Sequence, residues 1–261
     1  MKMDSVNLLA KKFFEAFYKK EWLGEFLSHI PKLDISEAYQ VQDLVAEMRV
    51  ENGEKVVGFK VGCTSHAIRS QFGLKAPIIG RLFAPHIYAE GKQLSWTDYV
   101  NCAIEPEMVL KIGMDLKGES LSDDHLINAI EYVSPGIEIH NFKFWCSPPS
   151  SQELICSGGI HAGLVIGNKK VSPQKMSFQN EVFRVYRDET IVTKAPASEI
   201  MGGPLHSLRW LVSLLTQRQM YLKRGSFVIP GSPVELVTIS TDTDLKVEID
   251  LLDNLTTKFK G

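Results

Sequence analysis

The apolar residues of the first 52 positions recur at helical spacing. Leu9, Phe13 and Phe17 mark one run, and Val41 and Val45 mark a second. A spacing of three or four residues places such side chains on one face of a helix. The pattern therefore predicts two amphipathic helices at the start of the chain.

Polar residues mark both ends of the second predicted helix. Asp34 is followed three residues later by Glu37, which is the spacing of a capping box, and Asn52-Gly53 is a stop signal. We therefore expect this helix to begin after Asp34 and to end near Asn52.

Beyond residue 55 the pattern changes to short apolar runs bounded by glycine and polar residues. These runs predict strands at 56–62, 103–112, 136–139, 162–166, 181–186, 226–229, 234–239 and 245–251. Two helices interrupt them, one at 123–133 behind Ser122 as a cap and one at about 206–221. Because few of the gaps between strands are long enough for crossover helices, we predict an α+β fold with a mixed, mostly antiparallel sheet system.

The chain shows no internal repeat and no linker rich in glycine, serine or proline. We therefore predict a single domain over residues 1–261. Its helical N-terminal portion is 1–55, and its β-rich portion, which carries the candidate chemistry, is 56–261.

Composition and charge narrow the classes of function. Of the 261 residues, 44% are hydrophobic and 23% are charged, and the formal net charge is −2. No basic surface is therefore predicted that would follow a nucleic-acid backbone, and no apolar run is long enough for a membrane span or a secretory signal. The cysteines, at positions 63, 102, 146 and 156, show no paired spacing. We expect a cytoplasmic protein with reduced thiols that binds neither nucleic acid nor a membrane.

Three glutamates lie inside apolar segments that are predicted to be strands. On a strand, Glu105 and Glu107 share one face, and two buried carboxylates side by side need a cation, a shared proton or water. Two solvated glutamates on an edge strand are the alternative. Glu138 is a third acid in such a segment, and together the three favour a hard cation of the Mg²⁺ or Mn²⁺ type. His140 shares the face of Glu138, and we expect it to pack or hydrogen-bond rather than to bind the metal.

Two further features carry candidate chemistry. Lys60 lies in an apolar run and either points at the site, where it would hold a substrate oxygen, or faces solvent from the strand. Glycine-containing segments at 157–163 and 230–232 either bring the backbone close to a ligand or form ordinary turns. Neither segment matches a phosphate loop, and zinc is disfavoured because His and Cys lack its ligand spacing.

Several short motifs, in order along the chain, resemble the 2-keto-4-pentenoate hydratase and oxalocrotonate decarboxylase family of the fumarylacetoacetate hydrolase superfamily. They are ISEAYQVQ at 35–42, GFKVGCTS at 58–65, PIIGRL at 77–82, IEPE at 104–107, IEI at 137–139, WL at 210–211 and GSFVIPGS at 225–232. The resemblance covers nearly the whole chain and implies a β-roll of the fumarylacetoacetate hydrolase type behind the N-terminal helices.

The resemblance also implies roles for particular residues. Glu105, Glu107 and Glu138 match the ligands of Mg²⁺ or Mn²⁺, and Lys60 and Ser232 match catalytic residues. The implied substrate is a small 2-oxo acid or its dienol tautomer, and we expect a homo-oligomer. The implied enzyme is a lyase that adds water to a 2-hydroxy-2,4-dienoate or 2-oxo-alkenoate, giving a 4-hydroxy-2-oxo acid.

The chain departs from the family at the groups that move protons. The family has an acid near Ile78 and Ile79, and it has Asp and Arg where this chain has Asn141 and Lys143. His161 lies where the family has an Asp-Asn-Ala-Ser stretch, and we predict that it carries the proton, because histidine titrates near neutral pH. The alternatives are a 2-oxo acid decarboxylase, a C–C hydrolase of the same superfamily, and a metal-binding homologue without catalysis.

Overall fold

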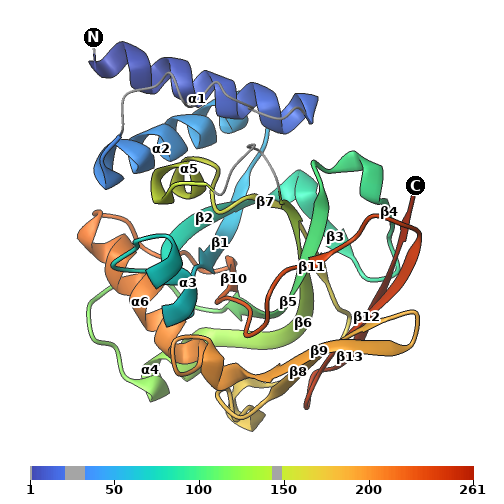
Figure 1. Ribbon diagram of the computed structural model, residues 1–261. Coiled ribbons are helices and arrows are strands. Elements are labelled where there is room, and N and C mark those ends of the chain that lie inside the picture. Colours follow the sequence, from blue (N-terminus) through green and yellow to red (C-terminus); the bar gives the residue numbers. More distant parts are fainter. Residues whose placement is uncertain (1, 21–32, 143–148) are drawn as a thin grey trace.

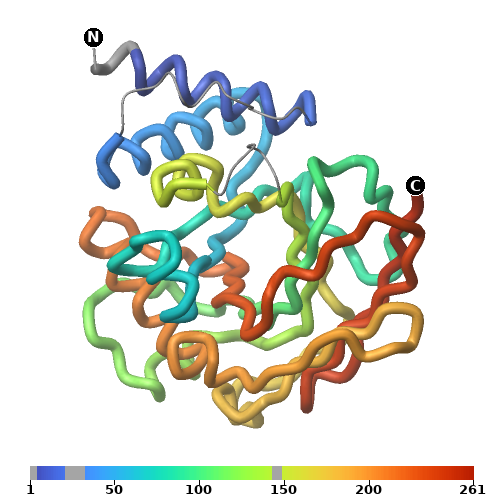
Figure 2. The backbone as a smooth tube through the Cα atoms, in the orientation of Figure 1, coloured from blue at the N-terminus to red at the C-terminus, as the bar shows by residue number. Residues whose placement is uncertain are grey.

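A computed structural model describes residues 2–20, 33–142 and 149–261 of the chain. Lys143 and Cys146 lie outside the described residues. Figure 1 shows three helices stacked at the N-terminal end of the molecule above the curled sheets, and Figure 2 follows the chain from there to the C-terminal strand. The stacked helices are α1 (Lys2–Lys19), α2 (Ile35–Glu51) and α5 (Ser151–Cys156).

The two predicted N-terminal helices are confirmed. Phe13 of α1, Val41 of α2 and Ile155 of α5 belong to one buried apolar cluster, so apolar side chains fill the space between the three helices. The capping box is also confirmed, because the Asp34 carboxylate accepts a hydrogen bond from the Glu37 amide at 2.8 Å while the Glu37 carboxylate accepts one from the Asp34 amide at 2.9 Å. The helix is therefore closed at its first turn by its own side chains.

The larger sheet surrounds the candidate site. Among the described residues it has eight strands, with the order β2-β1-β10-β5-β6-β7-β3 and with β11 paired to β5. Their bounds are β1 (Val56–Gly62), β2 (Ile78–Phe83), β3 (Ile87–Ala89), β5 (Cys102–Ile112), β6 (Ile130–Asn141), β7 (His161–Ile166), β10 (Phe227–Ile229) and β11 (Val237–Thr238). All of its pairs are antiparallel except β1 with β10 and β3 with β7.

A second sheet of five described strands packs against the first and closes the core. Its order is β4-β13-β12-β8-β9, and its bounds are β4 (Gln93–Ser95), β8 (Val182–Arg187), β9 (Thr190–Pro196), β12 (Thr243–Ile249) and β13 (Asp253–Lys260). Phe183 and Phe259 from this sheet are fully buried together with Ile137 from the first. The predicted α+β fold with mixed, mostly antiparallel sheets is confirmed.

Three further helices and four short 3-10 helices complete the described chain. The helices are α3 (His66–Gln71), α4 (Asp123–Ala129) and α6 (Pro204–Gln217). The 3-10 helices are Ala84–His86, Trp96–Asp98, Pro173–Lys175 and Ala197–Glu199. None of the described helices combines the length and the apolar character needed to cross a membrane.

One predicted helix is wrong over its second half. Helix α4 begins behind Ser122, whose hydroxyl accepts a hydrogen bond from the His125 amide, but it ends at Ala129 and not at residue 133. From Ile130 the chain is strand β6, and Val133 pairs with Leu110 of β5. Ile130, Tyr132 and Val133 are β-branched or aromatic residues, which favour strands over helices, and the long ladder with β5 includes them.

The predicted strands vary in accuracy. Strand β1 has the predicted bounds, while β11 covers only two residues of the expected 234–239. Strands β2, β3, β4, β9 and β13 and helices α3 and α5 were not predicted at all. Several of these elements are short, and polar residues are so frequent in β9 and β13 that a search for apolar runs passes over both strands.

Candidate metal centre

The ladder between β5 and β6 brings the predicted acids together. Glu105 lies directly opposite Glu138, Glu107 lies opposite Gly136, and His140 lies opposite Ala103. Residues two apart on a strand share a face, so the three glutamates and His140 all lie on one face of this strand pair. The partner of Glu107 is a glycine and the partner of His140 is an alanine, so neither residue faces a second large side chain directly across the ladder.

Glu107 is fully buried, and one of its oxygens is held by the backbone. Its Oε2 accepts a hydrogen bond of 3.1 Å from the Gly231 amide, whereas its Oε1 is buried without a partner. Burial and the nearby carboxylates of Glu138 and Glu105 raise the pKa of Glu107 well above its usual value. The Glu107 carboxylate therefore requires a positive charge or a proton beside it.

The Gly231 loop reaches Glu107 because β5 is uncovered there. Strand β10 pairs with β5 around Leu110, and β11 pairs with β5 around Ile104, so neither covers the stretch between them. That stretch contains Pro106, which has no backbone donor to lose. A second backbone segment can therefore approach the glutamates at this point.

Glu138 is also fully buried, and its two oxygens have different surroundings. Oε1 accepts from Lys60 Nζ at 3.1 Å and lies 2.7 Å from His161 Nδ1, while Oε2 has no hydrogen-bond partner. Burial alone would raise the pKa of Glu138, but the Lys60 ammonium and the imidazoles of His140 and His161 hold it at about 2. The carboxylate is thus ionised and fixed through one oxygen.

Lys60 is buried and points at the carboxylates, so the solvent-facing alternative is wrong. Only 3% of the residue is exposed, and Nζ also donates to the Gly159 carbonyl at 3.2 Å. Burial would lower the pKa of Lys60, but Glu138 and Glu105 raise it above its usual value. The ammonium therefore stays charged although the side chain is almost entirely buried.

The turn that follows α5 fits tightly over Lys60. A methyl group on Gly80 would lie 2.3 Å from the Gly158 carbonyl oxygen, and one on Gly159 would lie 3.1 Å from Lys60 Nζ. Gln42 fixes the same region, because its Nε2 donates to the carbonyls of Ile79 and Ile155 at 2.8 and 2.7 Å. The N-terminal helices thus hold the turn that closes around the lysine.

His161 reaches Glu138 because the ladder between β6 and β7 contains a bulge. Leu164 pairs with Glu138, and simple alternation from Leu164 would point His161 to the opposite face. A register shift after Ile139 places His161 opposite His140 instead. The bulge therefore adds an imidazole to the cluster that strand periodicity alone does not place there.

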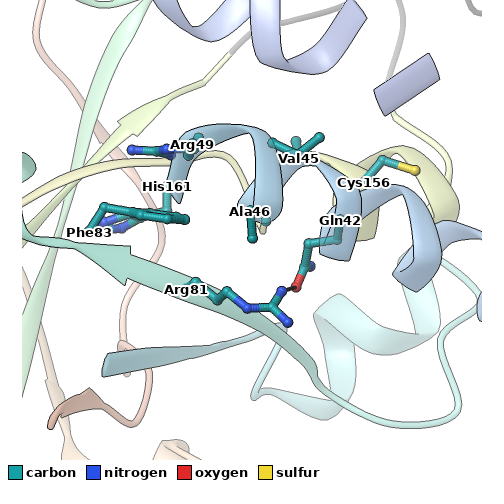
Figure 3. A pocket seen from close by; sticks show the side chains of 10 residues that line it. Gln42, Val45, Ala46, Arg49, Arg81, Phe83, Cys156 and His161 are labelled. Atoms are coloured by element: carbon teal, nitrogen blue, oxygen red, sulfur yellow. Dashed lines mark hydrogen bonds between the residues drawn. The ribbon is translucent and has the colours of Figure 1, made fainter. Parts of the chain in front are cut away.

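The ring of His161 is buried and neutral. Burial lowers the pKa of His161 to about 4, although Glu138 opposes the shift. Its Nε2 has no partner, and the residue also lines a cavity of about 30 Å³ together with Gln42, Arg49 and Phe83. Figure 3 shows the ring beside that of Phe83, with Arg49 nearby.

His140 lies between the two carboxylates that face each other. Its Nε2 is 3.1 Å from Glu105 Oε2 and 3.5 Å from Glu138 Oε2, and its Nδ1 is buried without a partner. Donor atoms of Glu105, Glu138 and His140 all lie within 4.8 Å of one another. Glu107 is not part of this closest group, although it shares the face.

The remaining predicted residues lie at the rim of the cluster. Ser232 is half-buried and follows Gly231. Its hydroxyl donates a hydrogen bond to the Val234 carbonyl and accepts one from the Val234 amide, both at 3.2 Å. The Cδ1 atom of Ile78 and Nζ of Lys60 lie beside the same face of Gly159. A hydrocarbon group therefore stands where the resemblance implies an acid. The side-chain oxygen of Asn141 accepts a hydrogen bond from the Val100 amide, so its recorded partner is a backbone group and not an ionisable side chain.

The donor set fits a divalent cation. With all three glutamates ionised, three carboxylates and one ammonium carry two net negative charges, which a divalent ion would neutralise. Glu107 and Glu138 each have one oxygen fixed by the protein and one buried oxygen without a hydrogen bond. Buried polar atoms are nearly always satisfied in folded proteins, and oxygen ligands are those that hard cations take.

The two glycine-containing segments supply groups that the sequence did not specify. Gly159 gives a carbonyl to Lys60, and Gly231 gives an amide to Glu107. The glycines themselves were the available signal, because they permit a close approach of the backbone. The cysteines described here, at positions 63, 102 and 156, are free thiols.

Comparisons with known sequences find relatives over most of the chain. No family model matches it. A 2-keto-4-pentenoate hydratase of Burkholderia vietnamiensis is 24% identical over 256 residues, which cover 98% of each chain. The 2-keto-4-pentenoate hydratase 1 of Dechloromonas aromatica is 26% identical over 226 residues, covering 87% of this chain and 86% of that one. A 2-oxo-hept-4-ene-1,7-dioate hydratase of Escherichia coli is 22% identical over 232 residues and covers 87% of both chains.

Comparison with solved structures establishes the fold. A 4-oxalocrotonate decarboxylase from Pseudomonas putida, complexed with magnesium and adipate, matches with a TM-score of 0.92 and 22% identity, covering 99% of this chain and 98% of that one. A fumarylpyruvate hydrolase from Pseudomonas aeruginosa, in complex with Mn²⁺ and pyruvate, matches with a TM-score of 0.59 and 14% identity, covering 77% of this chain and 88% of that one. The predicted resemblance is confirmed by these relatives and by this fold.

Proposed function

We propose that this chain, a relative of the 2-keto-4-pentenoate hydratases with the fumarylacetoacetate hydrolase fold, is a metal-dependent hydratase of short dienoic acids. The reaction adds water to a 2-hydroxy-2,4-dienoate or its 2-oxo-alkenoate tautomer and gives a 4-hydroxy-2-oxo acid. The names of the relatives support this reaction. The observation that carries it is the buried cluster of Glu105, Glu107 and Glu138 beside Lys60, with carboxylate oxygens left without a partner.

We assign the ion to these three glutamates and propose Mg²⁺ or Mn²⁺. When bound, the ion supplies Lewis-acid stabilisation of the negative charge that develops on the 2-oxo oxygen of the substrate. The protein contributes by holding Glu138 through Lys60 and His161, and Glu107 through the Gly231 amide, before any ligand arrives. Carboxylates held in this way need no rearrangement to receive the cation.

Lys60 is proposed to hold the substrate's carboxylate or its developing oxyanion. It is the charged donor beside the cluster, and its buried position strengthens any ion pair that it makes. His161 is proposed to move the proton, since its Nε2 is buried and free of any partner while Nδ1 is engaged by Glu138. Ser232 is proposed to bind substrate at the rim, on the strength of its place beside Gly231. These assignments stay predictions. So do the single domain over residues 1–261, the cytoplasmic location and the homo-oligomeric state.

Decarboxylation is the second candidate reaction, together with C–C hydrolysis on the same fold. The match to a 4-oxalocrotonate decarboxylase over 99% of this chain favours it. Loss of catalysis with retention of the metal is favoured by Ile78, whose side chain borders Lys60 where an acid is expected. Hydration, decarboxylation and C–C hydrolysis would all use Lys60 and the metal, so the products of the reaction are what separates these three.

The test is an absorbance assay on 2-hydroxypenta-2,4-dienoate with Mg²⁺ or Mn²⁺ present and after treatment with EDTA. Hydration predicts metal-dependent loss of the dienoate absorbance with formation of 4-hydroxy-2-oxopentanoate. Release of carbon dioxide from a 2-oxo dicarboxylic acid with no hydration would decide for the decarboxylase. Tight metal binding with no turnover of any such acid would contradict enzymatic function.

A further inference from the structure

His140 faces the metal cluster in a way that a packed histidine does not. The residue is 2% exposed, and the polar atoms that approach its Nε2 are the oxygens of Glu105 and Glu138. Its other nitrogen, Nδ1, is buried without a partner. Among the described residues, the ring therefore meets polar groups only through Nε2, which makes a hydrogen-bond contact of 3.1 Å with Glu105 Oε2.

The distances around Nε2 match those between neighbouring ligands of one ion. Two atoms that each lie about 2.1 Å from a metal and occupy adjacent corners of an octahedron are about 3 Å apart. The Nε2 atom of His140 lies 3.1 Å from Glu105 Oε2 and 3.5 Å from Glu138 Oε2. All three donors therefore lie close enough together to bind a single ion.

His140 and His161 lie beside different oxygens of Glu138. His161 bonds to Oε1 of Glu138, the oxygen that Lys60 also holds, and so helps to orient the carboxylate. His140 lies on the side of Oε2, which has no hydrogen bond. Ala103 pairs with His140 across the two strands, so the side chain of β5 directly opposite the ring is a small one.

We propose that His140 Nε2 is a ligand of the ion, and that the resulting nitrogen-and-oxygen centre selects a divalent first-row transition metal over Mg²⁺. The inference rests on the proposed metal dependence and adds a fourth ligand to the three glutamates. Mg²⁺ binds oxygen and gives up water reluctantly, whereas Mn²⁺ and the metals that follow it in the Irving–Williams order accept imidazole. The nitrogen donor therefore favours Mn²⁺ and heavier ions without excluding carboxylate ligands.

Pulsed electron paramagnetic resonance of the Mn²⁺-loaded full chain tests the inference. The protein is labelled with ¹⁵N-histidine, and the comparison is between wild type, His140→Gln and the matched control His161→Gln. We expect a histidine-nitrogen coupling in wild type and His161→Gln, and none in His140→Gln. Competition between Mn²⁺ and Mg²⁺ should show the Mn²⁺ preference falling at least about tenfold in His140→Gln. In His161→Gln the preference should change less than about threefold, because loss of a residue that only orients Glu138 weakens the binding of both ions alike.

The wild-type spectrum decides even if a variant fails to fold. Mn²⁺ bound to wild type without histidine-nitrogen coupling would overturn the inference and leave the proposed metal dependence standing. Coupling that persists in folded His140→Gln would also overturn it. A wild-type chain that binds neither Mn²⁺ nor Mg²⁺ would overturn the proposed function itself, and the ligand role of His140 with it.

Discussion

Replacing Lys60 with methionine should separate its electrostatic role from its packing role. Methionine keeps an unbranched stem against Gly80 and Gly159 but removes the ammonium that lies 3.1 Å from Glu138 Oε1. At that distance two unit charges attract by about 5 kcal/mol at an effective dielectric constant of about 20. Loss of one partner from a buried pair is typically destabilising by about 3–5 kcal/mol. The metal-free variant should therefore melt roughly 6–20 °C below wild type, at about 2–4 °C per kcal/mol.

The same variant should respond more strongly to a divalent cation. Without the ammonium, the three carboxylates carry one more uncompensated negative charge, so Mn²⁺ should bind at least about tenfold more tightly and raise the melting temperature by more than in wild type. Turnover should fall by about 10²-fold or more, because a preorganised donor for the substrate's oxyanion is lost. Thermal melts with and without Mn²⁺, calorimetric titration and the dienoate assay measure these three quantities.

The control is Lys194→Met, which removes an exposed lysine from the middle of β9. It should change the melting temperature and turnover little, as surface substitutions usually do. The reasoning fails if Lys60→Met melts with the wild type in the absence of metal. It also fails if the gain in stability on adding Mn²⁺ is no larger than in wild type.

Three further variants test the neighbouring groups. Glu107→Gln should weaken Mn²⁺ binding at least about tenfold with the fold retained, since ligand charge sets affinity for hard cations, and unchanged affinity in calorimetry would exclude Glu107 as a ligand. His161→Ala should lower kcat at least about tenfold with metal binding preserved, and full rescue by His161→Gln would show that the ring only orients a carboxylate. Burial alone would raise the pKa of Glu54, but hydrogen bonds from neighbouring side chains and the charge of Arg49 lower it to about 2. An unfolded glutamate has a pKa of about 4.3, so this stabilisation, at most about 3 kcal/mol and reduced by solvent screening, is present at neutral pH and is lost as the pH falls from about 4.5 towards 2. Glu54→Gln should accordingly be less stable than wild type in denaturant at pH 7, and the difference should shrink by pH 3, whereas a difference independent of pH would refute the linkage.

The sequence predicted the elements whose cause is local. The capping box of Asp34 and Glu37 forms within four residues, and the alternation of Glu105 and Glu107 needs only one strand. Both features were confirmed because hydrogen bonding and side-chain direction over such a span depend little on the remainder of the chain.

Features set by pairing between distant segments were not predicted. Residues 130–133 were predicted to be helical, but they form a strand because they pair with β5. The bulge that turns His161 towards Glu138 depends on the register between β6 and β7. Register is a property of two strands, so one strand's periodicity cannot reveal it. The position of His140 beside Glu105 likewise depends on a partner 35 residues away.

Lys60 shows how the curl of the sheet assembles the centre. Strands β10 and β5 lie between β1, which carries Lys60, and β6, which carries Glu138. Neighbouring strands are about 4.8 Å apart, so in a flat sheet the two backbones would be about 14 Å from each other. A lysine and a glutamate whose side chains both point straight out from such a sheet would not meet. The 3.1 Å contact therefore requires the sheet to curl until its faces converge.

That convergence links the stability of the fold to the metal. Folding brings Glu107 and Glu138 into a buried space and fixes one oxygen of each, but it leaves Glu107 Oε1 and Glu138 Oε2 without hydrogen bonds. Unsatisfied buried acceptors destabilise the metal-free chain, and a cation that binds them only in the folded state adds about 1.4 kcal/mol for each tenfold excess over its dissociation constant. Because the same oxygens are held in place before the ion arrives, the cost of leaving them without hydrogen bonds and the affinity of the site for a cation have one cause.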